Sequence, residues 1–209
     1  MHDLYNAVWT NKTLNKFLPR LPRQAYLVGG CVRDLILGID PSDYDIVFFG
    51  EPMILARQIS DILGGKPFFI DENRQVARVA VDHGNLTIDV SPPRGENIEA
   101  DLAERDITIN AMACDPTDGA LIDPTGGLED LSERRIRLIA EKNLKDDPLR
   151  GLRCLRFSVQ IGGSVDPGTM DLIRIHADSL HEAASERIKN EFFKALGHPV
   201  SSLFFKLLA

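Results

Sequence analysis

Two aspartates separated by a single residue, Asp43 and Asp45, stand at the beginning of the apolar run Tyr44–Phe49. Side chains alternate along a strand, so an Asp-x-Asp at the start of a strand points both carboxylates to the same side of a sheet. Upstream, Gly29 and Gly30 follow a first short apolar run and precede a stretch of helical character. The pattern predicts a strand, a helix that begins at the glycines, and a second strand that presents two acidic groups together.

Two carboxylates this close repel each other, so the arrangement needs positive charge beside it. Mg²⁺ favours a site with one or two carboxylates and phosphate oxygens. Gly29 and Gly30 let the backbone approach a phosphate chain, and the following helix offers its positive amino end. Asp89, on a neighbouring strand candidate, is either a third carboxylate of the site or an aspartate at a sheet edge. These features together indicate nucleotide chemistry, although an acidic turn over 40–43 is a second interpretation of the pair.

The composition indicates a globular protein without a membrane segment. The 209 residues suffice for one or two domains with a hydrophobic core. The three cysteines are far apart and lack metal-type spacing, which predicts reduced thiols in a cytoplasmic protein. No apolar run is long enough to cross a bilayer, and the first residues lack a signal-peptide pattern.

The charge distribution limits how the chain can meet nucleic acid. The net charge of −7 argues against electrostatic capture by the whole surface. It leaves room for a local basic groove, because arginines cluster at 134–137 and 150–156. Solvated helix faces explain these clusters equally well.

Hydrophobic periodicity predicts an α+β protein, with a mixed sheet followed by a helical part. Strands are expected at 25–29, 44–49, 66–70, 75–82, 86–90 and 136–140. Helices among them are expected at 31–37, 54–63, 98–103 and 107–113. From about Asn143 onward the periodicity is only helical, which predicts a mixed-sheet domain over 1–140 and a small all-α domain over 141–209. The apolar end, 203–209, is expected to pack against other structure and suits a chain that continues.

Five motifs resemble, in order, those of bacterial-type tRNA nucleotidyltransferases and poly(A) polymerases of the polymerase β superfamily. They are Gly29–Asp34 with Asp43–Asp45, Arg105–Ala113, Asp123–Leu131, Asp146–Phe157 and Ser185–Glu191. The match covers roughly 24–196, and the ordered set is specific although each motif alone is weak. The chain departs from the family pattern at Glu104, Ile107 and Asp146, where the family carries Arg, Phe and Glu.

The resemblance implies a nucleotidyltransferase head followed by a helical neck, with Mg²⁺ as cofactor. Asp43 and Asp45 are implied as the catalytic, metal-binding pair, with Asp89 as an optional third ligand. The residues implied in nucleotide binding are Gly29, Gly30, Arg33, Arg105, Asp106, Asn110, Asp147, Arg150, Arg153 and Arg156. Asp106 and Asn110 are expected to share one helix face, from which Asn110 reaches the sugar. Structural alternatives stay open: an Arg33–Asp34 pair that fixes helix to sheet, and solvated side chains at Arg153 and Arg156.

Asp147 and Arg150 together suit the recognition of a base edge. Cytosine and adenine both present an amino donor beside a ring-nitrogen acceptor, whereas uracil and guanine present the reverse. A carboxylate that accepts from the amino group and a guanidinium that donates to the ring nitrogen fit only C and A. At spacing three on a helix, the two side chains are neighbours. The alternative is helix capping by Asp147 before Pro148, with Asp146 available to share that role.

These features predict an enzyme that adds C, A or both to the tRNA 3′ end from CTP and ATP, without a nucleic-acid template. The segment Ser91–Arg105 is shorter than in relatives that build a complete CCA end, which favours CC or A addition, and CC slightly. A poly(A) polymerase shares every motif and is the first alternative. A non-catalytic nucleotide- or RNA-binding remnant is the second, although paired carboxylates bring no benefit to a mere binder. Without the body and tail that follow the neck in the family, nucleotide binding is expected to be intact and tRNA affinity poor.

Overall fold

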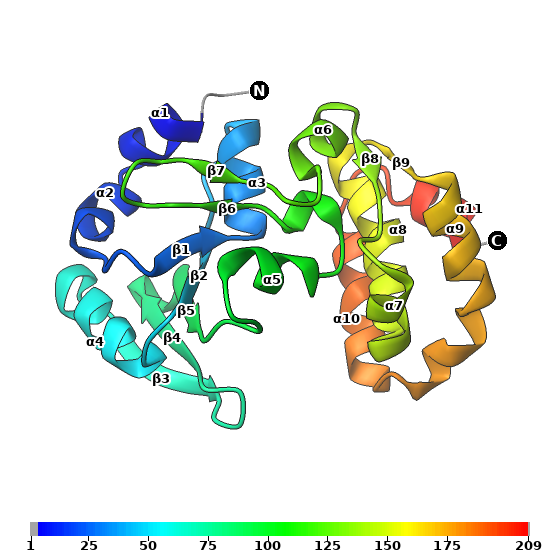
Figure 1. Cartoon of the computed structure of the whole chain (residues 1–209). Helices are drawn as coiled ribbons and strands as arrows, with labels where there is room; N and C mark the ends of the chain where they lie inside the picture. Colours follow the sequence, from blue (N-terminus) through cyan, green and yellow to red (C-terminus); the bar gives the residue numbers. More distant parts are fainter. Residues whose placement is uncertain (1–3, 209) are drawn as a thin grey trace. The chain divides into compact units, whose positions relative to one another are not determined.

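The structure is a computed structural model that describes residues 4–208, and the chain forms two compact units (Figure 1). The first consists of Met1–Ala103 and Asn110–Pro124, and the second of Glu104–Ile109 and Thr125–Ala209. Segments 104–109 and 125–140 therefore belong to the helical unit. The sequence had predicted instead a single boundary between the domains, at residue 140. Within the described residues, no helix combines the length and the apolar character that a membrane crossing requires.

A seven-stranded mixed sheet forms the centre of the first unit, in the order β3-β4-β5-β2-β1-β6-β7. The strands are β1 Ala25–Val28, β2 Asp43–Phe48, β3 Lys66–Asp71, β4 Val76–Val81, β5 Leu86–Ser91, β6 Ala113–Cys114 and β7 Leu121–Ile122. The β2–β5 pair is parallel and the other pairs are antiparallel. A hairpin joins β4 and β5, with a short turn of 3-10 helix, η2 Asp82–Gly84, between its strands.

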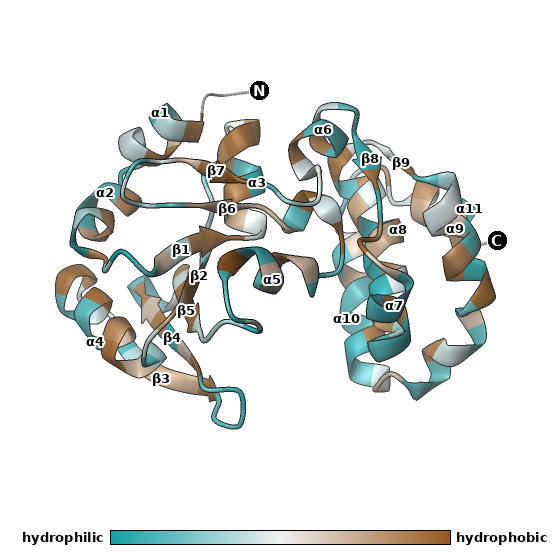
Figure 2. Ribbon diagram, viewed as in Figure 1, coloured by the Kyte–Doolittle hydropathy of each residue, from teal (hydrophilic) through white to brown (hydrophobic). Residues whose placement is uncertain are grey.

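Helices cover this sheet where the sequence supplies amphipathic stretches. They are α1 Leu4–Thr10, α2 Leu14–Phe17, η1 Leu18–Arg20, α3 Gly30–Leu37, α4 Pro52–Leu63 and α5 Ile98–Ala103. Along α4 brown and teal residues alternate in Figure 2, and the buried ones, including Leu55 and Ile59, pack toward β3, β4 and β5. Gly38 and Gly64 end α3 and α4 with φ of 74° and 77°. This left-handed conformation is strained for other residues, so glycine suits both positions, and the helix ends expected at 37 and 63 are confirmed.

The helix predicted over 107–113 is wrong. The structure has an isolated bridge between Ile107 and Leu138, one turn of 3-10 helix over Thr108–Asn110 (η3), and then strand β6. The backbone N–H of Thr108 donates to the carbonyl of Arg137, so the segment begins as an extended chain paired with a neighbour. The segment Ile107–Ile109 consists of β-branched residues, which tolerate extended backbone well. Asp106 and Asn110 consequently do not share a helix face.

The second unit is mainly helical. Its helices are α6 Gly127–Ser132, α7 Glu141–Asp146, α8 Leu149–Ile161, α9 Pro167–Ile175, η4 Ala177–Glu182, α10 Ser185–Leu196 and α11 Ser202–Leu208. It also holds a parallel two-stranded ladder, β8 Arg135–Ile136 with β9 Ser164–Val165. The expectation of an all-α part is therefore corrected, and the strand predicted over 136–140 is only two residues long. Gly163 admits this ladder, because a Cβ there would lie 1.9 Å from the carbonyl oxygen of Arg134.

One face of α8 builds the core of the second unit, as the periodicity predicted. Leu149, Leu152, Leu155 and Val159 are buried against α10 and α11. The apolar end of the chain contributes as well, since Phe204 is fully buried and meets Phe192 edge to face at 5.3 Å. The expectation that this end packs against other structure is confirmed.

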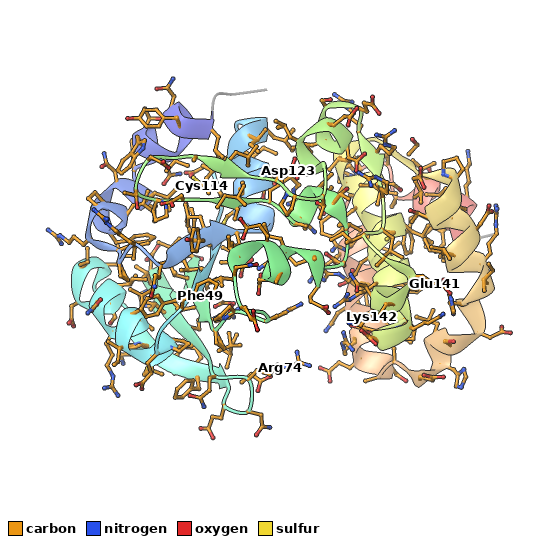
Figure 3. All side chains as sticks on the ribbon, in the orientation of Figure 1. Phe49, Arg74, Cys114, Asp123, Glu141 and Lys142 are labelled. Carbon is orange, nitrogen blue, oxygen red and sulfur yellow. The ribbon has the colours of Figure 1, made fainter. Side chains whose placement is uncertain are left out.

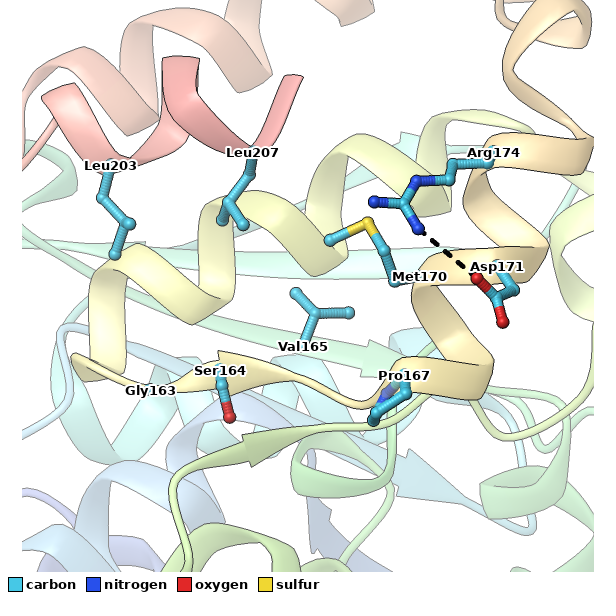
Figure 4. A pocket seen from close by; sticks show the side chains of 9 residues that line it. All are labelled: Gly163, Ser164, Val165, Pro167, Met170, Asp171, Arg174, Leu203 and Leu207. Atoms are coloured by element: carbon cyan, nitrogen blue, oxygen red, sulfur yellow. Dashed lines mark hydrogen bonds and ion pairs between the residues drawn. The ribbon is translucent and has the colours of Figure 1, made fainter. Parts of the chain in front are cut away.

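An apolar pocket of about 340 Å³ opens beside this core. In Figure 4, Val165 and Met170 face Leu203 and Leu207 of α11 across it, with Arg174 and Asp171 to one side. None of the residues implied in nucleotide or metal binding lines this pocket.

Replacement of Leu155 by Ala is expected to destabilise the protein by about 2–5 kcal/mol, because it leaves a cavity in this core. Urea unfolding followed by circular dichroism measures the change. Ile175→Ala is the matched control, since that side chain is 71% exposed and its truncation should change the free energy of unfolding by less than about 0.5 kcal/mol. Equal effects of the two substitutions would contradict the described core.

Candidate functional site

The two predicted carboxylates lie on one face of β2. Asp43 and Asp45 are exposed, whereas Tyr44 between them is only 1% exposed. The alternation expected of an Asp-x-Asp strand is therefore present. The parallel neighbour β5 places Thr87 opposite Asp43 and Asp89 opposite Asp45. The arrangement gathers oxygen atoms on one face of the β2–β5 pair, in the interior of the sheet, so Asp89 is not an aspartate at a sheet edge.

Hydroxyl groups hold the Asp43 carboxylate in place. Thr87 donates from Oγ1 to Oδ1 of Asp43, and Ser42 donates from Oγ to Oδ2 at 3.1 Å. Hydroxyl groups are neutral partners, so they orient this carboxylate and leave its charge uncompensated. Oxygen ligands of this kind suit Mg²⁺.

Asp89 differs from the pair in its surroundings. Arg78 of β4 donates from Nε to Oδ1 and from Nη2 to Oδ2 of Asp89, both at 2.6 Å. Among the described residues, no three His, Cys, Asp or Glu side chains are arranged to hold a metal ion together. The position of Asp89 is thus beside Asp45 in the register, with its carboxylate engaged by a guanidinium.

The glycine turn leads from β1 into α3. Gly29 has φ of 78°, and its N–H donates to the carbonyl of Met112 at 3.0 Å. The helix then begins at Gly30, as predicted. A glycine at 29 is required by this conformation, which side chains disfavour.

Arg33, in the first turns of α3, is buried and joined to two partners. Its Nη2 lies 2.7 Å from Oδ1 of Asp34, and its Nη1 donates to Oδ1 of Asn110 at 2.6 Å. The ion pair with Asp34 thus stays within α3, whereas the bond to Asn110 joins α3 to η3. The two implied nucleotide-binding residues Arg33 and Asn110 lie together, and each orients the other.

In the second unit, Asp147 and Arg150 are half-buried, and only Arg150 lies in α8. Asp147 lies between α7 and α8 with extended backbone, at φ of −149° and ψ of 97°, so the expectation that the two residues stand at spacing three on one helix is wrong. Asp147 accepts from the N–H of Leu149 at 3.3 Å through Oδ1 and from Nη2 of Arg187 at 2.6 Å through Oδ2. Arg150 Nη1 donates to the carbonyls of Glu104 and Arg105 at 3.3 and 3.4 Å. Asp147 therefore makes a long capping contact and an ion pair with α10.

The start of α8 is also tied to the segment that precedes η3. Asn143 donates from Nδ2 to the carbonyl of Arg105 at 2.6 Å. Lys142, labelled with Glu141 in Figure 3, forms an ion pair with Glu104 at 3.2 Å. These contacts fix Arg150 through the backbone carbonyls that it meets.

Farther along α8, two arginines lie in a continuous set of ion pairs. Arg153 Nε donates to Oδ2 of Asp106 at 2.6 Å, and Arg156 Nε donates to Oε2 of Glu191 at 2.5 Å. Arg156 is 7% exposed and stacks over the ring of Phe157 at 3.9 Å. The interpretation of Arg156 as a solvated side chain is therefore wrong.

Burial would by itself raise the pKa of the Asp106 carboxyl. The charge and hydrogen bond of Arg153, together with the N–H of Ile107, outweigh burial and hold this pKa below its ordinary value. The carboxylate of Asp106 is consequently ionised and anchors Arg153.

Three charged residues that contact the predicted site residues were not singled out from the sequence: Arg78, Arg187 and Glu191. Glu191 and Arg187 lie in a recognised motif, Ser185–Glu191, but without a role for each side chain. Arg78 lies outside every motif, and only the strand register reveals it.

Comparison with known proteins identifies the class of the chain. Residues 25–137 match the family described as the poly A polymerase head domain, and the chain belongs to this family. Residues 164–209 match a second family, described as a probable RNA and SrmB-binding site of polymerase A. The resemblance to bacterial-type tRNA nucleotidyltransferases and poly(A) polymerases is confirmed.

The individual relatives are tRNA nucleotidyltransferases. A CC-adding tRNA nucleotidyltransferase of Geobacter sulfurreducens is 40% identical over 175 residues, which are 84% of this chain and 41% of the relative. An A-adding tRNA nucleotidyltransferase of Deinococcus radiodurans is 37% identical over 87% of this chain and 42% of its own length. The chain therefore spans less than half the length of these curated relatives.

Solved structures show the same fold. The Thermotoga maritima CCA-adding enzyme complexed with tRNA aligns with a TM-score of 0.85 and 33% identity, over 98% of this chain and 53% of that one. A complex of a CCA-adding enzyme with CTP aligns with a TM-score of 0.87 and 30% identity, over 99% of this chain and 52% of that one. The predicted α+β fold class is confirmed.

The depressed pKa of Asp106 predicts a specific acid sensitivity. Its ionised pairing with Arg153 stabilises the fold fully above the ordinary pKa of 3.8 and is lost as the pH falls through the lower pKa of the folded state. Asp106→Asn should therefore reduce the free energy of unfolding at pH 6, and the deficit should shrink below about pH 3.8. Urea unfolding of both proteins across this range measures it, with exposed Asp171→Asn as control. A deficit that does not change with pH would contradict the assigned pair.

Proposed function

We propose that this chain is the head and neck part of a template-independent nucleotidyltransferase that adds C, A or both to the tRNA 3′ end. The observation that carries the proposal is the exposed pair of carboxylates on β2, in a chain whose relatives are CC-adding, A-adding and CCA-adding enzymes. A binding module gains nothing from two exposed like charges beside each other on one strand face.

Asp43 and Asp45 are proposed to hold Mg²⁺. The residues fit this ion, because both carboxylates face one side of β2 and the triphosphate of the substrate completes the oxygen ligands. When bound, Mg²⁺ supplies charge that neutralises the triphosphate and lowers the pKa of the attacking 3′-hydroxyl. Asp43 is held in position by Thr87 and Ser42. The family to which the chain belongs consists of nucleotidyltransferases, whose chemistry generally depends on a metal.

Gly29, Gly30, Arg33 and Asn110 are proposed to seat the nucleotide on the first unit. The first turn of α3 offers N–H groups at a positive helix end, which suits phosphate oxygens. Arg33 and Asn110 orient each other, so the amide of Asn110 is presented in a fixed geometry to the sugar.

Asp147 and Arg150 are proposed to select the base on the second unit. Asp147 lies just before α8 and Arg150 in its first turn, and neither side chain is fully buried. Asp147 accepts from the amino group of C or A, and Arg150 donates to the ring nitrogen. Arg105, Asp106, Arg153 and Arg156 are proposed to support this site. For Asp106 and Arg156, the ion pairs at 2.6 and 2.5 Å make this support indirect.

CC addition is the preferred form of the activity, and A addition follows. Only Pro92–Asn97 separates β5 from α5. The segment whose movement could switch base recognition from C to A is therefore short. A CC-adding enzyme is among the relatives that share the chain's sequence over most of its length. Poly(A) addition is the second candidate, because the matching family is described by the poly A polymerase head.

Incorporation of each labelled nucleoside triphosphate tests the activity directly. The substrates are tRNA that ends before CCA, after CC and after CCA, at high concentration. Incorporation of CTP on the first substrate and of no nucleotide on the third is expected. Repeated incorporation of ATP on unrelated RNA would identify a poly(A) polymerase instead. No incorporation by this chain or by a longer form that contains it would support the non-catalytic alternative.

Asp43→Asn is expected to reduce incorporation by on the order of 10³-fold, because one carboxylate alone holds the cation poorly. Asp61→Asn is the control, since this aspartate is exposed on α4 of the same unit. Single-turnover rates with saturating CTP measure the effect. A loss below tenfold for Asp43→Asn would contradict the metal site.

Asp147→Ala and Arg150→Ala are expected to reduce the preference for CTP over UTP by about 10²-fold or more, because a polar mismatch no longer leaves a buried charge unpaired. The preference is measured as the ratio of the kcat/KM values for the two nucleotides. Asp171→Ala, a change of an exposed aspartate in the same unit, should leave the ratio unchanged. An unchanged ratio in the Asp147 and Arg150 variants would show that other residues read the base.

A further inference from the structure

Three charged side chains form a row across the sheet of the first unit. Arg78 of β4 lies opposite Asp89 of β5, and Asp89 lies opposite Asp45 of β2. Residues that are direct partners in neighbouring strands project from the same face of a sheet. The charges along the row are therefore one positive and two negative, with Asp89 in the middle.

Arg78 forms a bidentate ion pair with Asp89. Nε and Nη2 each donate to a different carboxylate oxygen at 2.6 Å. The two side chains are only 34% and 19% exposed. A forked arginine–carboxylate pair is among the stronger hydrogen-bonded ion pairs, and partial burial reduces the competition from water. The hydrogen bond to Asp89 also raises the pKa of Arg78, and the charges of Asp43 and Asp45 add to this.

The consequence for a cation at the carboxylates is electrostatic and geometric. Asp43, Asp45 and Asp89 would together carry three negative charges, whereas Arg78 reduces the sum to two. Arg78 occupies an acceptor site on each oxygen of Asp89 and offsets its negative charge, so Asp89 would be a weaker ligand for a cation than Asp43 or Asp45. Asp43 and Asp45 would then be the carboxylates that hold a divalent cation.

We propose that Arg78 is a positioning residue that keeps Asp89 out of the metal's coordination sphere, so that Asp43 and Asp45, and not Asp89, bind the cation. This inference rests on the metal site of the proposed function. It assigns Asp89 a charge-setting role in place of direct ligation.

Mn²⁺ binding without nucleotide, measured by electron paramagnetic resonance of the free ion, tests the proposal. The proteins are the wild type, Arg78→Gln, the double variant Arg78→Gln with Asp89→Asn, and Arg78→Lys. Arg78→Gln should bind Mn²⁺ on the order of tenfold more tightly, because it releases the Asp89 carboxylate and removes a positive charge. The double variant should return to within about threefold of the wild type, since it lacks both charges. Arg78→Lys keeps the charge and should bind like the wild type or slightly more tightly.

The matched control is Arg74→Gln. Arg74 lies in the turn between β3 and β4 (Figure 3), its side chain is 81% exposed, and its ion pair with Asp71 is long, at 3.7 Å. Removal of that positive charge should leave Mn²⁺ affinity unchanged. Thermal unfolding of each variant checks that it is folded, and the double variant avoids an unpaired, partly buried carboxylate.

Two results would overturn the proposal. A double variant that binds Mn²⁺ tenfold more weakly than the wild type would show that Asp89 is itself a ligand. An Arg78→Gln variant that binds no more tightly than the wild type would show that Arg78 does not restrain Asp89. Failure of the underlying metal site is recognised separately, because in that case Asp43→Asn and Asp45→Asn would leave wild-type Mn²⁺ binding unchanged.

Discussion

The parallel pairing of β2 with β5 is the interaction that brings Asp43, Asp45 and Asp89 to one face of the sheet. Every other pair of strands in the large sheet is antiparallel, and this pair alone joins two strands that run the same way. Its register brings Thr87 to Asp43 and Asp89 to Asp45. Because side chains alternate along strands, a shift of one residue would turn the carboxylates of one strand away from those of the other. The buried Tyr44 and Ile46 between and beside the aspartates hold that register, since a shift would expose them.

In the second unit, a set of buried and half-buried ion pairs holds α8 in place. Asp106, Arg153, Glu191 and Arg156 alternate in sign from one element to the next. Removal of a single member would leave a buried charge without compensation, which is far costlier than the loss of an exposed pair. The set therefore gives α8 a defined position relative to α10 and to the segment before η3.

The sequence predicted β1 to β5 of the large sheet because each of these strands is marked by a local pattern, whereas β6 and β7 were not predicted. The ends of the helices expected at 31–37 and 54–63 were also correct, and each is followed by a glycine with positive φ, Gly38 or Gly64. The segment after Arg105 was mistaken for a helix because its pairing partners, Arg137 and Leu138, lie about 30 residues downstream. The two-residue ladder of β8 and β9 escaped prediction for the same reason. Non-local backbone pairing leaves little trace in local periodicity.

For the candidate site, sequence motifs located most residues but not their partners. The alternation at Asp43 and Asp45 predicted a shared face, and the structure has it. The engagement of Asp89 by Arg78 depends on a register between strands that no motif encodes. Likewise, the sequence gives no sign that Arg156 is buried, because its partner Glu191 lies on α10, 35 residues further along the chain.

The second unit is built from two pieces of chain, 104–109 and 125–209, and this has a consequence for synthesis on the ribosome. The first piece emerges early, but Arg153 and Arg150 follow more than 40 residues later, and Phe204, which completes the core, follows later still. A growing chain can therefore complete the sheet while Asp106 still lacks its counter-ion. Recombination with a single crossover between Asp106 and Arg153 would likewise separate these two partners.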